Sequence, residues 1–365
     1  MLKKRLFWMM ALIGVMFVFA LSGCDFLNGD EDENGDPFTV KNADGWNNAL
    51  DAIKKGGKDK EYTVTVNGSF SVPSSKFTFG INNSGITVTL QGNGTISLSN
   101  AGSLLDIYSN QTVIVKDLTL RGFSANNSPV VNCNGNFRME GSASVTGNTG
   151  GCGVYMSYGH NKTFTMQDNA SVTGNTSSSN HSGGGVYVGS GTNFIMKDNA
   201  SVSGNTSTGS GGGVLISTGT FTMQGGTVSN NTSPAGGGVF VGSSGSKAAF
   251  VMQGGSVSDN ISNGRGGGIY VFYNWGSFNM QGGTVSGNSA NGNGGGIYLS
   301  GRTGTFGDFT KNGGIIYGNS EGINSNTASS QGHAVYQYDV SNSRWRNSTA
   351  GQDINTANND FWSND

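Results

Sequence analysis

A repeat of large apolar residues constrains the fold of this chain more than any other feature. Phe-x-Met recurs six times, each copy is followed by Val-x-x-Asn, and Ile316 with Asn319 continues the series. Successive phenylalanines are 27 to 30 residues apart. The phenylalanines are Phe137, Phe164, Phe194, Phe221, Phe250 and Phe278, and the asparagines are Asn148, Asn175, Asn205, Asn231, Asn260 and Asn288. A regular period of this length indicates a solenoid, in which every repeat forms one layer.

Each repeat contains three short segments of alternating apolar and polar residues, which are typical of β-strands. One of them follows Gly-Gly-Gly, as in residues 183–187, 266–270 and 294–298, where glycine suits a corner with positive φ. Three strands per repeat predict one turn of a parallel β-helix, with turns about 4.8 Å apart and right-handed winding. We therefore predict an all-β fold: a right-handed parallel β-helix (solenoid) of about ten three-strand turns over residues 61–340.

Columns of equivalent residues explain how so polar a chain can form a dry interior. Only 34% of the residues are hydrophobic and 63 are glycines, but each strand needs to place only two side chains inside. In the Gly-Gly-Gly strand these are Val186 and Val188 and their equivalents. The asparagines at one corner are expected to stack as hydrogen-bonded amide ladders.

The N-terminus has the features of a secretory signal peptide over residues 1–23. Lys3, Lys4 and Arg5 precede a 16-residue apolar run, which is shorter than the roughly 20 residues of a membrane-spanning helix. The run ends in Leu-Ser-Gly-Cys24, which resembles the lipobox of bacterial lipoproteins. This resemblance implies cleavage before Cys24 and lipid attachment at Cys24. The alternative is an uncleaved anchor in which the cysteine has no such role.

A charged segment separates Cys24 from the repeats. Six acidic residues between Asp25 and Asp36 predict a solvated, flexible tether over residues 24–40. The lipid would hold the protein at the outer membrane and cell surface, or at the periplasmic face of the inner membrane. An aspartate at position 25 leaves both locations open.

The segments at the two ends of the solenoid are expected to cap it. Trp46, Leu50 and Ile53 share one helix face, which predicts a capping helix within residues 41–60, started by Asp44 and stopped at Gly56-Gly57. Residues 341–365 lose the repeat but retain aromatic residues, and we interpret them as a C-terminal cap over the open edge of the last turn.

The repeat resembles that of chlamydial polymorphic outer-membrane proteins and, more widely, the β-helices of the pectate-lyase-like superfamily. The Gly-Gly-Ala-Ile and Phe-x-x-Asn motifs of the chlamydial proteins appear here as Gly-Gly-Gly-Val/Ile and Val-x-x-Asn. The similarity covers residues 130–340 well and residues 62–130 loosely. Together with the lipobox at Cys24, the overall layout resembles that of spirochaete-type lipoproteins that carry such repeats, and this resemblance implies surface exposure and adhesion.

Many members of that superfamily cleave polysaccharides, so carboxylates are the candidates for catalysis. Asp168 and Asp198 fall at equivalent positions of neighbouring turns, about 5 Å apart, a spacing that suits a cation or a carboxylate pair. The alternative is that both aspartates form turns. His160, His181 and His333 lack ligand-like spacing. We predict no catalytic residue, no metal and no cofactor.

The chain has two cysteines within the repeats. Cys133 and Cys152 lie at different positions along equivalent strands, which predicts a separation of more than about 10 Å. We therefore expect two free, buried thiols and no disulfide.

One strand of each repeat carries a large residue between its inward valines, and alternation directs that residue outward. In one interpretation these rings stack on each other and cover the sheet. In the other they form a platform for a glycan or a protein, with two further aromatic residues in the loop "VFYNWGS". The candidate ligand contacts are Tyr155, Tyr187, Phe240, Tyr270, Tyr273, Trp275 and Tyr298.

These patterns favour a non-catalytic surface protein over an enzyme. The hypothesis is a lipid-anchored, exported β-helix that presents its surface for adhesion to a glycan or a host protein. The alternative is a carbohydrate-active β-helix enzyme, a polysaccharide lyase or glycoside hydrolase. A net charge of −2 gives no general attraction to nucleic acid, which we do not expect as a partner.

Overall fold

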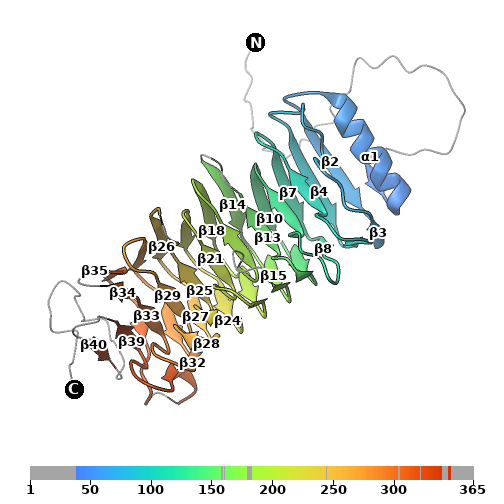
Figure 1. Cartoon of the computed structure of the whole chain (residues 1–365). Coiled ribbons are helices and arrows are strands. Elements are labelled where there is room, and N and C mark those ends of the chain that lie inside the picture. The colour runs from blue at the N-terminus through green and yellow to red at the C-terminus, as the bar shows by residue number, and fades with distance from the viewer. Residues whose placement is uncertain are drawn as a thin grey trace, which may run out of the picture. The chain divides into compact units, whose positions relative to one another are not determined.

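The computed structural model describes residues 38–157, 159, 161–178, 183–243, 245–302, 305–320, 322–338 and 344–346. These residues form a parallel β-solenoid of about 10 turns of the right-handed type, with one α-helix near the N-terminus (Figure 1). The predicted fold class is confirmed. The signal peptide, Cys24 and most of the acidic tether lie outside the described residues. The tether is shorter than expected, because Thr39–Val40 already form strand β1, which pairs with β2.

Successive turns contribute their strands to four parallel sheets. Sheet A contains β1 (Thr39–Val40), β2 (Glu61–Val66), β4 (Thr87–Gly92), β7 (Thr112–Lys116), β10 (Asn136–Glu140), β14 (Lys162–Met166), β18 (Thr192–Met196), β22 (Thr220–Met223), β26 (Ala248–Met252), β30 (Gly276–Met280) and β36 (Asp308–Lys311). Sheet B contains β3 (Phe70–Val72), β5 (Thr95–Leu98), β8 (Thr119–Arg121), β11 (Ser144–Thr146), β15 (Ser171–Thr173), β19 (Ser201–Ser203), β23 (Thr227–Ser229), β27 (Ser256–Ser258), β31 (Thr284–Ser286) and β37 (Ile315–Ile316).

The other two sheets complete the turn. Sheet C contains β6 (Leu105–Ile107), β9 (Val131–Cys133), β13 (Val154–Met156), β17 (Val186–Val188), β21 (Val214–Ile216), β25 (Val239–Val241), β29 (Ile269–Val271), β33 (Ile297–Leu299), β39 (Val335–Gln337) and β40 (Arg344–Arg346). Sheet D contains β12 (Thr149–Gly150), β16 (Thr176–Ser177), β20 (Thr206–Ser207), β24 (Thr232–Ala235), β28 (Ile261–Arg265), β32 (Ser289–Ala290) and β38 (Thr327–Ala328). A short antiparallel pair, β34 (Gly301–Arg302) and β35 (Thr305–Phe306), and the 3-10 helix η1 (Gly322–Asn324) lie in the last turns.

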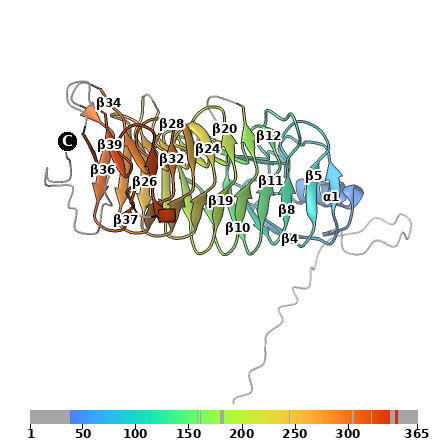
Figure 2. The same cartoon turned by 90° about the horizontal axis from the view of Figure 1, so that it is seen from below.

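Sheet D adds a fourth strand to the turns that contain it, where the repeat predicted three. Its strands follow one another along the solenoid (Figure 2). Several have only two residues, such as β16 with Thr176 and Ser177. Two residues are too few to show an alternation of apolar and polar side chains, so the sequence pattern did not reveal them.

The motif residues stack in register from turn to turn, as predicted. Phe164 pairs with Phe194, and Met166 pairs with Met196. The phenylalanine rings form one continuous stack from Phe137 to Phe309, with centroids 4.6 to 5.4 Å apart. Since all of this stack up to Phe278 is buried, the column of rings forms one wall of the interior.

Glycine is required at the corner before sheet C. Gly211 has a φ of 66°, which is unfavourable for other residues. At Gly212 a Cβ atom would lie only 2.4 Å from the carbonyl oxygen of Gly237 in the next turn. The backbones of neighbouring turns approach too closely here for any side chain, which explains the Gly-Gly-Gly motif.

The predicted asparagine ladder is present and buried. The side chain of Asn205 accepts from the backbone and side-chain nitrogens of Asn175, and its own Nδ2 donates to Asn231. The prediction for the last member was wrong, because Asn319 is exposed and Asn326 occupies the ladder position beside Asn288. Residues 319–325, which include η1, are inserted before the ladder residue.

Helix α1 (Ala43–Gly56) covers the N-terminal end of the solenoid, as predicted. Its buried face contains Trp46, Ala49, Leu50 and Ile53. The predicted cap was wrong: Asn42 caps the helix by accepting from the backbone N–H of Gly45, at 2.9 Å. The backbone at position 42 is extended, which the N-cap geometry requires, and Asp44 already lies inside the first turn.

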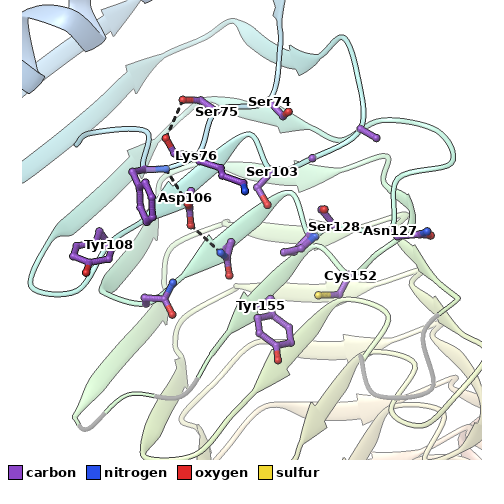
Figure 3. Close-up of a pocket in the computed structure, with 16 residues that line it drawn as sticks. Ser74, Ser75, Lys76, Ser103, Asp106, Tyr108, Asn127, Ser128, Cys152 and Tyr155 are labelled. Atoms are coloured by element: carbon purple, nitrogen blue, oxygen red, sulfur yellow. Dashed lines mark hydrogen bonds between the residues drawn. The ribbon is translucent and has the colours of Figure 1, made fainter. Parts of the chain in front are cut away.

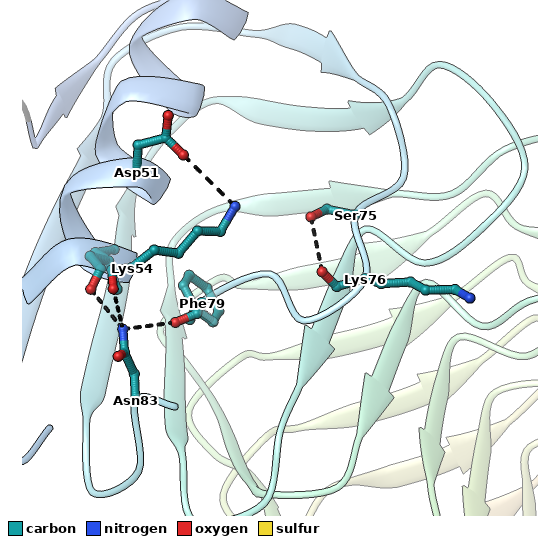
Figure 4. A network of polar contacts seen from close by, with 7 residues as sticks. Asp51, Lys54, Ser75, Lys76, Phe79 and Asn83 are labelled. Atoms are coloured by element: carbon teal, nitrogen blue, oxygen red, sulfur yellow. Dashed lines mark hydrogen bonds and ion pairs between the residues drawn. The ribbon is translucent and has the colours of Figure 1, made fainter. Parts of the chain in front are cut away.

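Asn83 fixes the C-terminal end of α1 (Figure 4). Its Nδ2 donates to the carbonyl oxygen of Ile53 at 2.8 Å and to that of Lys54 at 3.3 Å. The same amide donates to Phe79 at 3.2 Å. Asn83 therefore satisfies helix carbonyls that have no partner within the helix, and it ties α1 to the loop before β4.

Strand β40 pairs antiparallel with β39, so the parallel order of sheet C ends there. Residues 341–343 and 347–365, the rest of the predicted C-terminal cap, lie outside the described part of the chain. No helix among the described residues has both the length and the apolar character needed to cross a membrane.

Candidate functional site

The middle residue of the parallel sheet C strands faces away from the solenoid interior, as alternation predicted. Val186 and Val188 belong to the interior core, whereas Tyr187 between them belongs to a second, separate hydrophobic cluster. We call these middle residues from β13 to β39 the outer column. They are Tyr155, Tyr187, Leu215, Phe240, Tyr270, Tyr298 and Tyr336.

The rings of the outer column cover one another. Tyr155 stacks on Tyr187 with centroids 4.5 Å apart, and Phe240 stacks on Tyr270 at 4.8 Å. Exposure is 6% for Tyr187, 9% for Phe240 and 1% for Tyr298. This burial leaves a ligand little access to the ring faces, and it favours the interpretation in which the column covers sheet C.

The pKa values of two tyrosines toward the C-terminal end of the outer column reflect their burial. Loss of solvent raises the pKa of Tyr270 and of Tyr298 above the usual value. The Arg265 guanidinium lies 5.3 Å from the centroid of the Tyr298 ring, in cation–π contact. These hydroxyls therefore stay protonated at neutral pH.

The loop that carries Tyr273 and Trp275 packs largely on itself. Phe272 lies 6.1 Å from Phe240 of the outer column, and Tyr273 lies 4.5 Å from Phe272, measured between ring centroids. Both Tyr273 and Trp275 are half-buried. Their accessible edges remain candidate contacts, but the loop mainly extends the cover of the outer column.

A cleft opens where the outer column gives way to polar residues toward the N-terminus (Figure 3). In β9 and β6 the middle positions are Asn132 and Asp106, in register with Tyr155. The cleft has a volume of ≈ 700 Å³ and is walled by loop residues 74–77, 101–103 and 127–129. Tyr155 is the outer-column residue that lines it.

Asp106 organises the floor of the cleft. Its Oδ2 accepts from the backbone N–H of Phe77 at 2.8 Å, and its Oδ1 accepts from Asn132 Nδ2 at 2.8 Å. Its own N–H donates to Thr78 Oγ1, also at 2.8 Å. Asp106 is only 8% exposed, although it lines the cleft. Its carboxylate therefore mainly positions the neighbouring groups to which it is hydrogen-bonded.

Two accessible rings form an aromatic corner in the cleft. Phe77 and Tyr108 meet edge to face, with centroids 5.3 Å apart and planes at 87°. They are 39% and 38% exposed. Lys76 extends toward Ser103 and forms no ion pair with any residue that the structure describes. The cleft thus offers exposed rings beside an ammonium group and side-chain amides.

No protein-family model matches the chain, and no curated protein or solved structure matches it.

The two aspartates considered for catalysis accept hydrogen bonds from backbone N–H groups. Asp168 and Asp198 both have positive φ, 57° and 52°. Asp198 Oδ2 accepts from the backbone N–H of Asp168 at 3.1 Å, and Asp168 Oδ2 accepts from that of Gly141 at 2.9 Å. These bonds support the turn-forming alternative, since each carboxylate links its own turn to the preceding one.

Metal ligands do not gather in the part of the chain that the structure describes, where no three His, Cys, Asp or Glu side chains could hold a metal ion. His333 Nδ1 accepts from the backbone N–H of Ala328 at 3.0 Å, and burial lowers its pKa. His160 and His181 lie outside the described residues.

Both repeat cysteines are free and buried, as predicted. Cys133 belongs to the interior core, whereas Cys152 belongs to the cluster on the outer side of sheet C. Burial raises the pKa of each thiol to about 12. The two thiols are therefore separated by the sheet and chemically inert while the protein is folded.

Sequence reasoning identified Tyr155 but missed the rest of the cleft. Asp106 and Asn132 are the middle residues of β6 and β9, in register with the outer column, so a comparison of these strands with the later repeats could have marked the change from aromatic to polar. Phe77 and Lys76 gave no such signal. They belong to a loop without repeat character, and the winding of the chain alone brings them over Asp106.

Proposed function

We propose that the protein is an exported, lipid-anchored β-helix that binds a glycan or a protein partner through the outer face of sheet C, without catalysis. The observation that carries the binding role is the open cleft at the N-terminal end of the outer column. In this cleft the exposed rings of Phe77 and Tyr108, which lie in loops beside sheet C, stand together with polar side chains such as Asn132. Anchoring is inferred from the lipobox that ends in Cys24.

The position of the carboxylate favours binding over hydrolysis. Asp106 is the one carboxylate among the described residues that line the cleft, and both of its oxygens already accept hydrogen bonds. Glycoside hydrolysis commonly uses two carboxyl groups, one as acid and one as base or nucleophile. In this cleft Asp106 acts as a structural acceptor.

Lipid attachment is tested by growing cells that express the full chain with an alkyne-tagged fatty acid. We expect the chain to take up the label and the Cys24→Ala variant to lose it. Cys152→Ala, the control, removes a buried thiol and should keep the label. Unlabelled wild-type protein would refute the lipid anchor.

Binding and catalysis are separated by two measurements on the full chain in mild detergent. A glycan array and a pull-down from host surface proteins report partners, and a reducing-sugar assay with an absorbance assay for unsaturated products reports cleavage. We expect partner capture without product. Product release would replace the binding proposal with the carbohydrate-active enzyme.

A further inference from the structure

We propose that the cleft is a binding site for a short saccharide of two or three sugar units, in which Phe77 is the stacking surface and Asp106 is its positioning residue. This inference rests on the proposed function and names the ligand class and the residues that hold it. Five observations on the cleft support it.

The backbone conformation of Phe77 is unusual for its residue type. Its φ is 51°, in the left-handed region that disfavours bulky side chains. Among the described residues with positive φ other than glycine, the remaining ones are aspartate, asparagine or alanine. Asparagine or glycine at position 77 would suit this backbone better.

Phe77 is also exposed, although an exposed ring gains little from folding. The residue is 39% exposed, so Phe77 combines an unfavourable backbone conformation with an apolar surface that the protein leaves uncovered. Neither property helps the folded state, and strained residues concentrate at ligand sites. A ligand that packs on the ring would explain both.

Hydrogen bonds hold Phe77 in this conformation. Its N–H donates to Asp106 Oδ2 at 2.8 Å, and its carbonyl oxygen accepts from Gly80 N at 2.8 Å. Thr78, the next residue, exchanges two bonds with Asp106: Thr78 N donates to the Asp106 carbonyl oxygen at 3.2 Å, and Asp106 N donates to Thr78 Oγ1 at 2.8 Å. The backbone that carries the ring is therefore fixed before any ligand binds.

Tyr108 is fixed by a separate set of bonds. Its N–H donates to Gln111 Oε1 at 2.9 Å, and Gln111 Nε2 donates to the Gly80 carbonyl oxygen at 2.6 Å. Gln111 is fully buried, so this anchor is rigid. Phe77 and Tyr108 thus form a preorganised corner of two rings.

The chemistry around the corner fits a sugar. Aromatic faces pack against the C–H groups of a sugar ring, and amide and ammonium groups exchange hydrogen bonds with its hydroxyls. Asn132, Asn134 and Lys76 supply such groups along the cleft. A volume of ≈ 700 Å³ lies within the range of small-molecule sites. A stable protein interface would instead cover a surface of roughly 800 Å² on each partner.

The test uses the full chain in mild detergent on an array of neutral and acidic oligosaccharides of two to six units. The oligosaccharide that binds best is then titrated calorimetrically. For Phe77→Asn we expect at least ten-fold weaker binding with no decrease in melting temperature. Ile323→Ala, which shortens a side chain that is 94% exposed and lies in the last turns of the solenoid, should bind like the wild type.

The role of Asp106 is tested with two substitutions. Asp106→Ala removes the acceptor for the Phe77 N–H and should weaken binding about ten-fold or more. Asp106→Asn retains a side-chain oxygen and should restore most of the affinity. Equal loss in both variants would show that the carboxylate charge itself, and not the position of Phe77, is required, and would overturn the positioning role.

Three results would overturn the saccharide site: no oligosaccharide binds, Phe77→Asn binds with unchanged affinity, or Phe77→Asn loses affinity only together with its melting temperature. If no oligosaccharide binds and a pull-down captures a protein partner equally well with wild type and Phe77→Asn, this inference is refuted and the proposed function stands. Absence of lipid at Cys24 would refute the anchor alone.

Discussion

Both polar atoms of the Asn205 side chain form hydrogen bonds, and these bonds connect three successive turns. Its Oδ1 accepts from Asn175 N and Nδ2, and its Nδ2 donates to the Val172 carbonyl oxygen at 2.9 Å and to Asn231. We predict that Asn205→Ala lowers the free energy of unfolding by about 3 kcal/mol, because it leaves buried backbone groups without partners. Guanidinium unfolding followed by circular dichroism measures this loss.

Asn199 provides the matched control within the same turn. It is exposed, and its side chain makes one long contact with Asn169, at 3.4 Å. Asn199→Ala should change the free energy of unfolding by less than about 0.5 kcal/mol. Similar losses in the two variants would show that the ladder contributes no more than an exposed asparagine.

The residue scale also shows what the sequence could and could not predict. The ladder asparagines were predictable because they repeat, and Asn319 was the wrong choice because an insertion moved the ladder to Asn326. Only the polar middle residues of β6 and β9 could have marked the cleft. The pairing of Phe77 with Asp106 was not predictable, because the two residues belong to different turns and neither repeats. A repeated sequence pattern predicts which residues stack in columns. The cleft consists of residues that do not repeat, so its position depends on how the loops fold, which the pattern does not specify.

At the scale of elements, α1 depends on Asn83 for its C-terminal end. Asn83→Ala would leave the carbonyl groups of Ile53 and Lys54 without this donor beneath the helix. We predict a loss of about 2 kcal/mol and faster hydrogen exchange confined to α1 and the first turns. Asn82→Ala, which changes an exposed neighbour, should leave the exchange of α1 unaltered.

Cys133 and Cys152 lie on opposite sides of sheet C, and we expect their thiols to be equally unreactive. Because burial raises both pKa values to about 12, almost no thiolate exists at pH 8 in the folded protein. In the Cys24→Ala variant, where Cys133 and Cys152 are the two remaining cysteines, we predict no reaction with Ellman's reagent at pH 8 until the chain unfolds, when two thiols per chain appear. Rapid reaction of either thiol in the native protein would contradict the burial described here.

Longer elements were predicted more reliably than short ones. The sheet A strands carry several alternating residues and were found from that pattern, whereas the two-residue strands of sheet D were not. Sheet D forms because each turn must return from the asparagine corner to the glycine corner beside its neighbours. Its strands therefore depend on stacking rather than on local sequence.

For the whole molecule, the stacked columns predict that one turn can be removed without changing the fold. Met223 and Met252 are equivalent residues of neighbouring turns. Deletion of residues 224–252 joins Met223 to Gln253, which restores the order Met-Gln-Gly-Gly found in the native sequence. Sheets A to D would each lose one strand and close in register, because each repeat mainly contacts its neighbours.

A deletion out of register is the control for this prediction. Removal of residues 224–247 joins Met223 directly to Ala248, so two sheet A strands follow each other without the intervening corners. We expect the in-register deletion to retain the β-sheet circular dichroism spectrum and a cooperative thermal transition, and the out-of-register deletion to lose the transition. If both variants fold equally well, equivalent positions do not determine the stacking. If both fail, the turns depend on contacts beyond their nearest neighbours.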